Sequence, residues 1–181
     1  MTSTGDADSF RLPEAIALLE TTPGVLQSLL QHLPHDWLHF KEDSDAWSPH
    51  TVLLHFVHNE RTNWIPRLRV LLSKDAVRKF APFDQLPKDG ELAEEPAAQL
   101  IAKFAQLRQE SLSFLRGLDL RSDQFDRRAE HPTLGTVSLG QLLATWVVHD
   151  LNHLHQITKS LAKRYQASVG PWRRNLAILD L

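Results

Sequence analysis

The sequence predicts an all-α fold, a four-helix bundle, from two observations. Four segments of about 20 residues carry the apolar spacing of amphipathic helices, and no segment shows the clear alternation of a strand. A long link separates the second segment from the third, and it could form a long crossover connection across the bundle. A simple up-down-up-down order of the helices is therefore not assured.

The first predicted helix runs from about Pro13 to Leu33, with Pro13 in the first helical position. Proline and glycine stand together at Pro23 and Gly24 within this segment. Because proline removes a helical hydrogen bond, we expect a kink or a break there.

The second predicted helix begins after Ser48, whose side chain suits the N-cap position, with Pro49 in the first turn. It continues to about Ser73, and we expect a kink near Pro66. The link that follows, "FAPFDQLPKDGELAEEP", contains three prolines and one glycine, so it is predicted to be a loop.

The third predicted helix starts near Pro96 and ends near Gly117, where glycine is a typical stop. The next segment, "RRAEHPTLGTVSLG", is predicted to be a turn-rich connection because of its proline and two glycines. The fourth helix is expected to be capped near Ser138 and to run to about Tyr165.

Length and charge limit the classes of protein that the chain can form. Its 181 residues suffice for one domain, so residues 12–181 are predicted to form a single helical domain after a flexible leader of residues 1–11. The net charge of -2 argues against nucleic acid as a partner. No apolar run approaches the ~18 to 20 residues of a membrane span, so we expect no membrane partner.

Cysteine is absent from the chain. This composition fits a reducing cytoplasm. Any metal site must therefore use His, Asp or Glu side chains, and any thiol chemistry must use sulfur from another molecule.

The stretch "TWVVHDLNHLHQI" in the fourth helix indicates a candidate site. His149 and His153 are spaced i, i+4, so their imidazoles lie on successive turns, with Gln156 on the same stripe. This spacing lets one helix offer two metal ligands, but it is equally compatible with a solvated or hydrogen-bonded pair. His155 points to the opposite side and is expected to be exposed.

A third ligand must come from another helix, and the second helix offers His55 and His58. His55 shares a narrow polar stripe with Asn59 and Thr62 on a helix that is otherwise largely apolar. Polar groups on a buried helix need partners, because each unpaired one costs on the order of 1 to 3 kcal/mol. The stripe either faces the histidine pair across a cavity or forms the solvent-exposed side of the helix.

Asp150 and Glu60 are acidic residues at unexpected places, since Asp150 falls within the apolar arc of the fourth helix and Glu60 is a similar case on the second. A buried lone carboxylate is costly, so each is expected to have a partner. Supporting a ligand imidazole or pairing with an arginine is favoured over binding a metal directly. The residues expected to line a pocket are Asn59, Thr62, Trp146 and Gln156.

Two motifs resemble the DinB-like, or YfiT-like, superfamily. "WSPHTVLLHFVHNE" is similar to that family's tryptophan-serine start, followed by a helix with an early ligand histidine and a later acid. "HPTLGTVSLGQLLATWVVHDLNHLHQI" is similar to its run of HP, G, S/T-L and H-D-x-x-H-x-x-Q-I, which is the more specific motif. The resemblance covers roughly residues 12 to 165.

The resemblance implies a four-helix bundle with a long crossover and a three-histidine metal site. Its ligands would be His55, His149 and His153, with His58 as the alternative ligand on the second helix. The resemblance also implies a cytoplasmic protein that forms homodimers. Activities of the family include transfer reactions on low-molecular-weight thiols and thiol-dependent isomerisation.

Together these observations favour a metal-dependent enzyme that acts on a small-molecule substrate, by transfer or hydrolysis involving a low-molecular-weight thiol. Three imidazoles leave positions on Zn²⁺, Ni²⁺ or a similar divalent ion open for water or a thiol. Glu60 and Asp150 are candidate bases. Two alternatives stay open: a non-catalytic bundle with a structural or vestigial metal site that acts through partner binding, and a metal-free bundle.

Overall fold

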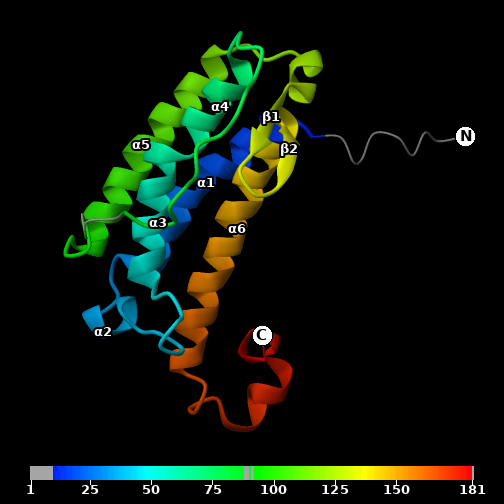
Figure 1. Ribbon diagram of the computed structural model, residues 1–181. Coiled ribbons are helices and arrows are strands. Elements are labelled where there is room, and N and C mark those ends of the chain that lie inside the picture. Colours follow the sequence, from blue (N-terminus) through cyan, green and yellow to red (C-terminus); the bar gives the residue numbers. More distant parts are fainter. Residues whose placement is uncertain (1–9, 88–89, 91, 181) are drawn as a thin grey trace, which may run out of the picture.

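The structure, a computed structural model, describes residues 10–87, 90 and 92–180. Its long helices form a bundle, so the predicted all-α four-helix fold is confirmed (Figure 1). Most of the predicted leader, residues 1–9, lies outside the described residues. Within the described ranges, no helix combines the length and the hydropathy that crossing a membrane requires.

The helices pack in an order that differs from their order in the chain. The long segments are α1 (Leu12–Leu30), α3 (Pro49–Thr62) with α4 (Trp64–Leu72), α5 (Ala97–Gly117) and α6 (Leu139–Arg164). α1 and α3 each pack against both α5 and α6, so α1 and α3 occupy opposite corners of the bundle. The connection of residues 73–96 runs back along the bundle, and α5 therefore points the same way as α3 and α4 (Figure 1). This connection is the predicted long crossover.

The second helical segment is divided at Asn63, three residues before Pro66, near which a kink was predicted. α3 begins after Ser48, whose Oγ accepts a hydrogen bond from the amide of Thr51 at 3.2 Å, as expected for an N-cap. A proline ring clashes with the carbonyl four residues earlier. The helix is therefore interrupted next to Thr62, about one turn before the proline.

α1 continues through Pro23 without the predicted break. Because proline has no amide hydrogen, the carbonyl of Leu19 loses its helical hydrogen bond. Nη1 of Arg108 donates to this carbonyl at 2.8 Å. A side chain of α5 thus replaces the missing backbone donor.

A β-hairpin lies in the segment predicted to be only a turn-rich connection, which corrects that prediction. β1 (Arg128–His131) and β2 (Gly135–Ser138) pair antiparallel. Gly135 has φ +75°, a conformation that glycine adopts without strain. Strands of four residues are too short for alternation to stand out in the sequence. The amide of Phe80 donates to β1 at 2.9 Å, which ties the crossover to the hairpin.

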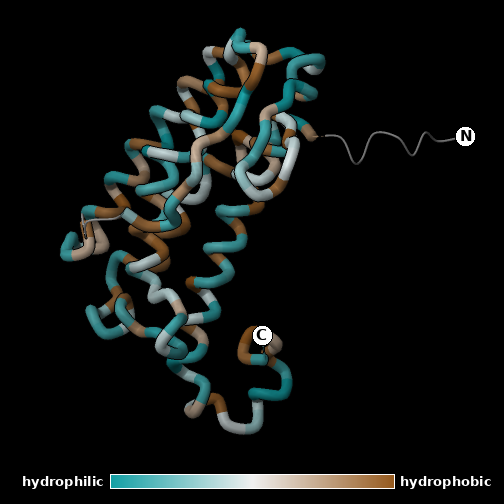
Figure 2. The backbone as a smooth tube through the Cα atoms, viewed as in Figure 1, coloured by the Kyte–Doolittle hydropathy of each residue, from teal (hydrophilic) through white to brown (hydrophobic). Residues whose placement is uncertain are grey.

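Apolar side chains form two core clusters along the bundle, and hydrophobic and hydrophilic residues alternate along each helix (Figure 2). One cluster includes Leu19, Trp64, Leu112 and Val147, and the other includes Leu26, Val57, Phe104 and Ile157. Between the two clusters, each helical segment carries a buried polar residue: Thr22, Glu60, Arg108 and Asp150. The shorter elements are α2 (His35–Leu38) and 3-10 turns at Ser122–Asp126, Gly170–Asn175 and Ala177–Leu179.

Candidate metal centre

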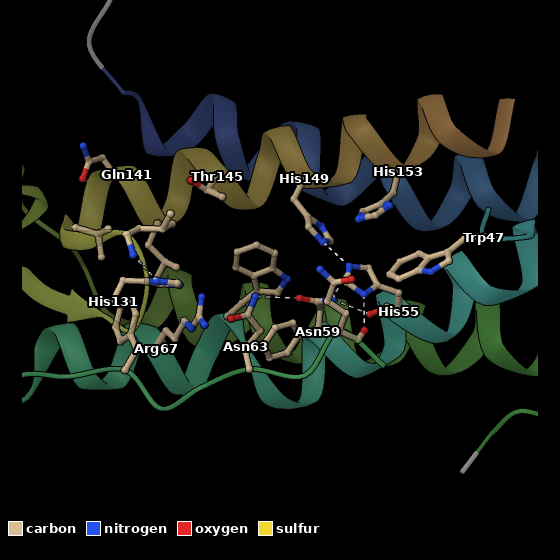
Figure 3. A pocket seen from close by; sticks show the side chains of 17 residues that line it. Trp47, His55, Asn59, Asn63, Arg67, His131, Gln141, Thr145, His149 and His153 are labelled. Atoms are coloured by element: carbon tan, nitrogen blue, oxygen red, sulfur yellow. Dashed lines mark hydrogen bonds between the residues drawn. The ribbon is translucent and has the colours of Figure 1, made fainter. Parts of the chain in front are cut away.

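Three imidazoles meet where α3 packs against α6: His55 from α3, and His149 and His153 from α6 (Figure 3). Nε2 of His55 lies 2.9 Å from Nε2 of His149. One ligand atom from each of the three residues lies within 4.8 Å of the other two. The structure therefore brings together the three histidines that the sequence singled out, and they could hold a metal ion.

Hydrogen bonds set the tautomers of two of these rings. Nδ1 of His55 donates to the carbonyl of Gln85 at 2.6 Å, and Nδ1 of His153 donates to Oε1 of Gln156 at 2.8 Å. Both partner oxygens only accept hydrogen bonds, so each ring carries its proton on Nδ1. Nε2 of each ring is therefore unprotonated, and this nitrogen is the atom that can bind a metal.

His149 completes the donor set. Its Nδ1 is buried without a hydrogen-bond partner and lies 3.6 Å from Oδ1 of Asp150. This distance is too long for a hydrogen bond, yet the carboxylate charge favours a proton on Nδ1 over one on Nε2. Nε2 of His149 and Nε2 of His55 lie 2.9 Å apart, within hydrogen-bond distance, and Nδ2 of Asn59 also donates to Nε2 of His55. The Nε2 atoms of the two rings thus converge on one point, an arrangement of imidazoles that fits a divalent ion.

Burial keeps the imidazoles of His55 and His153 neutral. Desolvation lowers the pKa of His55 to about 3 and the pKa of His153 to about 4, and the neighbouring histidines contribute in the same direction. A protonated imidazole cannot bind a metal through the protonated nitrogen, so metal affinity depends on the neutral form. Both rings are therefore in the ligating form at neutral pH.

A cavity of about 320 Å³ opens beside the three imidazoles (Figure 3). Its apolar walls are formed by Trp47, Trp64, Phe80, Phe83, Leu134, Val137 and Leu142. Its other lining residues, apart from the histidine cluster, are Asn59, Asn63, Arg67, Gln85, His131, Gln141 and Thr145. Mostly apolar walls with a few polar groups are typical of sites for small organic molecules.

A second buried polar cluster surrounds Arg108, whose exposed fraction is 1%. Its guanidinium donates to Oε1 of Glu60 at 2.7 and 2.9 Å and to the carboxylate of Asp150 at 2.6 and 3.2 Å. Thr22 also donates to Asp150, at 2.7 Å, and Trp146 donates to Glu60 at 3.2 Å. Burial, the largest single influence, acts to raise the pKa of Asp150, but the charge of Arg108 and the hydrogen bonds to the carboxylate together outweigh it, so the net shift is downward. Both carboxylates thus pair with arginine, and neither lines the cavity, which does not support the suggested role as a base.

The other residues predicted to line the pocket lie in different places. Asn59 lines the cavity, with Nδ2 2.9 Å from Nε2 of His55. Gln156 stands behind His153 as its hydrogen-bond partner and is not part of the lining. Thr62 is exposed and Trp146 is buried in the core, so neither lines the cavity as predicted.

These two differences have local causes. The helix break shifts the inward position from Thr62 to Asn63, whose Nδ2 donates to Oδ1 of Asn59 at 2.9 Å. Trp146 turns toward Glu60 because its indole N–H needs a buried acceptor.

The remaining histidines are outside the three-histidine cluster. Nε2 of His58, the alternative ligand, hydrogen-bonds to the carbonyl of Asp84 at 2.9 Å. His155 is exposed, as predicted. His131, a loop residue in the prediction, ends β1 and lines the cavity.

Sequence reasoning missed Arg67, Arg108 and the carbonyl of Gln85. Arg108 occupies a core position of α5, and a charge in an apolar stripe is a signal that could have revealed it. A backbone carbonyl carries no such signal, because its position depends on the course of the crossover. Arg67 stands between apolar residues on α4, where one charged side chain per turn is ordinary.

Comparisons with known proteins agree with this geometry. The model of the DinB superfamily matches residues 18–157. A protein of Oceanobacillus iheyensis named "putative metal-dependent hydrolase" is 26% identical over 162 residues, which span 88% of this chain and 91% of that protein. The solved structure of YfiT from Bacillus subtilis, described as "a probable metal-dependent hydrolase with an unusual four-helix bundle topology", is similar with a TM-score of 0.72 at 20% identity. The match covers 92% of this chain and 94% of YfiT, so the two share a fold.

Proposed function

This chain belongs to the DinB superfamily, and from that premise we propose that it is a metal-dependent enzyme. His55, His149 and His153 hold one divalent ion, such as Zn²⁺ or Ni²⁺, and the adjoining cavity takes a small-molecule substrate. The position of the cavity carries this proposal, because structural metal sites are closed by protein ligands whereas catalytic sites keep an open position. The same observation favours an enzyme over a non-catalytic bundle.

The reaction in this proposal is hydrolysis or group transfer that involves a low-molecular-weight thiol. When bound, a divalent ion at three imidazoles lowers the pKa of water or of a thiol and so supplies a nucleophile near neutral pH. The names of the two relatives support hydrolysis. The chain has no cysteine, so a reacting thiol would enter with the substrate.

Hydrogen bonds and aromatic neighbours orient the imidazoles of the proposed metal site. The Nδ1 hydrogen bonds of His55 and His153 fix the direction of their Nε2 atoms, a role that typically contributes tenfold to 100-fold in metal affinity. The indole of Trp47 lies nearly parallel to the ring of His153, at 6.0 Å between centroids and 9° between planes. These aromatic walls exclude water from the apolar part of a substrate.

Metal binding is the first test. Metal-stripped protein that is reloaded with Zn²⁺ and desalted should retain about one ion per chain by elemental analysis. His149→Ala and His153→Ala should lower the affinity more than about 100-fold, because each removes a ligand. His155→Ala, on the exposed side of the same helix, is the matched control and should bind as the wild type does. Full affinity in both ligand variants would refute the proposal.

Catalysis requires a separate test, since a metal site can be inert. Release of p-nitrophenolate from its acetate ester reports hydrolysis, and conjugation of chlorodinitrobenzene to glutathione reports thiol transfer. In either assay the rate should follow the metal content and disappear in His153→Ala while it persists in His155→Ala. A protein that binds Zn²⁺ tightly but accelerates neither reaction would favour the non-catalytic alternative.

Two further expectations remain part of the proposal. We propose that the protein works as a homodimer in the cytoplasm. The absence of cysteine is compatible with a reducing compartment. Light scattering on the purified chain measures the oligomeric state directly.

A further inference from the structure

We propose that the cavity recognises an anionic group of its ligand through Arg67, at the end opposite the three imidazoles, with His131 as a second donor. The ligand class is then a small organic acid with an apolar body and a terminal anion. This inference deepens the proposed function and rests on it only in calling the bound molecule a substrate. The anion site itself depends on residues of this chain alone.

Arg67 is a half-buried cation that has no carboxylate partner among the described residues. It lines the cavity from α4, and its guanidinium lies 5.0 Å from the ring centroid of Phe80 and 5.6 Å from that of Phe83. Stacking on rings uses the faces of the guanidinium and leaves its N–H donors at the edges available. In the part of the chain that the structure describes, its side chain forms no hydrogen bond or ion pair, and burial alone lowers its pKa.

Arg108, a structural arginine of the core, differs from Arg67 in its partners. The guanidinium of Arg108 meets the carboxylates of Glu60 and Asp150 and the carbonyl of Leu19. A partly buried charge without such partners is unfavourable, and an anion that enters the cavity would supply them. Arg67 is thus arranged as a binding residue rather than as a structural one.

His131 offers a neutral hydrogen-bond donor at the same end of the cavity. Its Nδ1 accepts from the amides of Thr133 at 3.2 Å and of Leu134 at 3.3 Å, so the proton of the neutral ring is on Nε2. Burial lowers the pKa of His131, and the charge of Arg67 lowers it further. The hairpin therefore holds a neutral Nε2–H donor near the guanidinium.

The lining between these residues and the imidazoles defines the rest of the ligand. Figure 3 shows Arg67 and His131 at one end of the cavity and His55, His149 and His153 at the other. None of the described lining residues is acidic, so the charge of Arg67 is not balanced within the cavity. The walls between the two ends are aromatic and aliphatic, which suits an apolar segment. A ligand that spans the cavity would place its anion at Arg67 and its other end at the metal centre.

Hexanoate and hexanamide are matched probes of this site, since they differ in charge but not in the length of their apolar part. The full chain is used in its metal-stripped form, so that carboxylate cannot bind a metal, and binding is followed by the fluorescence of Trp47 and Trp64 in the cavity wall. We expect hexanoate to bind more tightly than hexanamide. Arg67→Gln should weaken hexanoate about tenfold, the size of one charge-assisted hydrogen bond, and leave hexanamide unchanged.

Two further variants test whether the effect is specific to the charge of Arg67. Arg69→Gln removes an exposed arginine of the same helix that stacks on Phe114 outside the cavity, and it should leave both affinities unchanged. Arg67→Lys should restore part of the hexanoate affinity, because it keeps the charge but loses the planar fork. Equal hexanoate affinity in wild type and Arg67→Gln, or no preference of the wild type for hexanoate over hexanamide, would overturn the inference.

The outcome separates this inference from the proposed function. If Zn²⁺ binds at the imidazoles but Arg67→Gln leaves the affinity for hexanoate unchanged, the proposed anion site is wrong and the proposal of a metal-dependent enzyme is unaffected. If hexanoate depends on Arg67 but no metal binds, the cavity recognises anions and the metal-dependent reaction is wrong.

Discussion

Helices α3 and α6 contribute to two buried polar clusters of opposite character, and α5 adds the arginine of the second. The histidine cluster, His55 with His149 and His153, turns donor atoms of like kind toward one another beside an open cavity. The arginine cluster, Arg108 with Glu60 and Asp150, sets opposite charges against one another in the closed core.

This difference distinguishes a cluster that could bind a ligand from a cluster that stabilises the fold. The arginine cluster pairs its one guanidinium with both carboxylates and sits between the two apolar core clusters, away from the cavity. In the histidine cluster, Nε2 of His55 and Nε2 of His149 converge to 2.9 Å beside the cavity, where a metal ion could be bound. His149 and Asp150 are adjacent in sequence, yet the rotation of about 100° between successive residues of α6 directs them to different clusters.

Removing the arginine should have the largest effect on stability. Arg108→Met leaves two carboxylates buried without a counter-charge, so we expect a loss of about 3 to 5 kcal/mol in the free energy of unfolding. Urea unfolding followed by circular dichroism measures this loss. Arg116→Met is the control, because it removes an exposed partner of Glu20 and should cost less than about 1 kcal/mol. A similar loss in both variants would contradict the stabilising role of the buried arginine cluster.

The histidine cluster should make the metal-free protein sensitive to mild acid. The pKa values of His55 and His153 in the folded state, about 3 and about 4, lie below the ordinary value of 6.5, so the unfolded chain binds more protons in between. Stability is therefore complete above pH 6.5 and decreases as the pH falls, by up to about 1.4 kcal/mol per pH unit for each proton taken up. Urea unfolding between pH 7 and pH 5 measures the slope.

His153→Leu should flatten this slope, and His155→Ala should preserve it, since His155 is exposed. An unchanged slope in His153→Leu would show that other groups cause the acid sensitivity.

The hydrogen bond behind His153 should affect the metal and not the fold. Gln156→Ala removes the acceptor of Nδ1, so we expect Zn²⁺ affinity to fall tenfold to 100-fold, about 1.4 to 2.7 kcal/mol. Competition with a fluorescent zinc chelator measures the affinity. Asn152→Ala, an exposed amide on the same helix, should leave it unchanged, and a wild-type affinity in Gln156→Ala would argue that the bond is incidental.

The smallest effect is expected at His58. This residue was the alternative ligand, but its Nε2 bonds to the carbonyl of Asp84. His58→Ala should therefore keep its Zn²⁺ affinity within about twofold of the wild type, because no ligand is lost. A loss comparable to that of His153→Ala in the same chelator competition would move the metal centre toward the crossover.

Much of the fold could be predicted because its signals are local. Ser48 and Ser138 each accept from the backbone at the start of a helix, as their N-cap positions predicted. The effects of Pro23 and Pro66 on their helices were harder to predict. They depend on which group replaces the lost hydrogen bond and on where the helix is interrupted. For Pro23 that replacement is Arg108, a residue far away in the chain.

The i, i+4 spacing, a periodic signal, pointed to His149 and His153 as a candidate pair, whereas the choice of His55 over His58 came from the family resemblance. The cavity could not be predicted, since its walls come from the crossover and the hairpin as well as from the helices. Trp146 illustrates the limit: it was expected to line the pocket, but its indole N–H donates to Glu60 in the core. Long-range partners of this kind have no periodic signature.

We propose above all that one divalent ion sits between His55, His149 and His153 and faces the cavity. Anomalous diffraction from crystals of the zinc-loaded protein, collected above and below the zinc absorption edge, locates the ion directly. We expect one strong anomalous peak at ~2.0–2.1 Å from Nε2 of each of the three histidines. A site without a peak, or a peak held by other side chains, would contradict it.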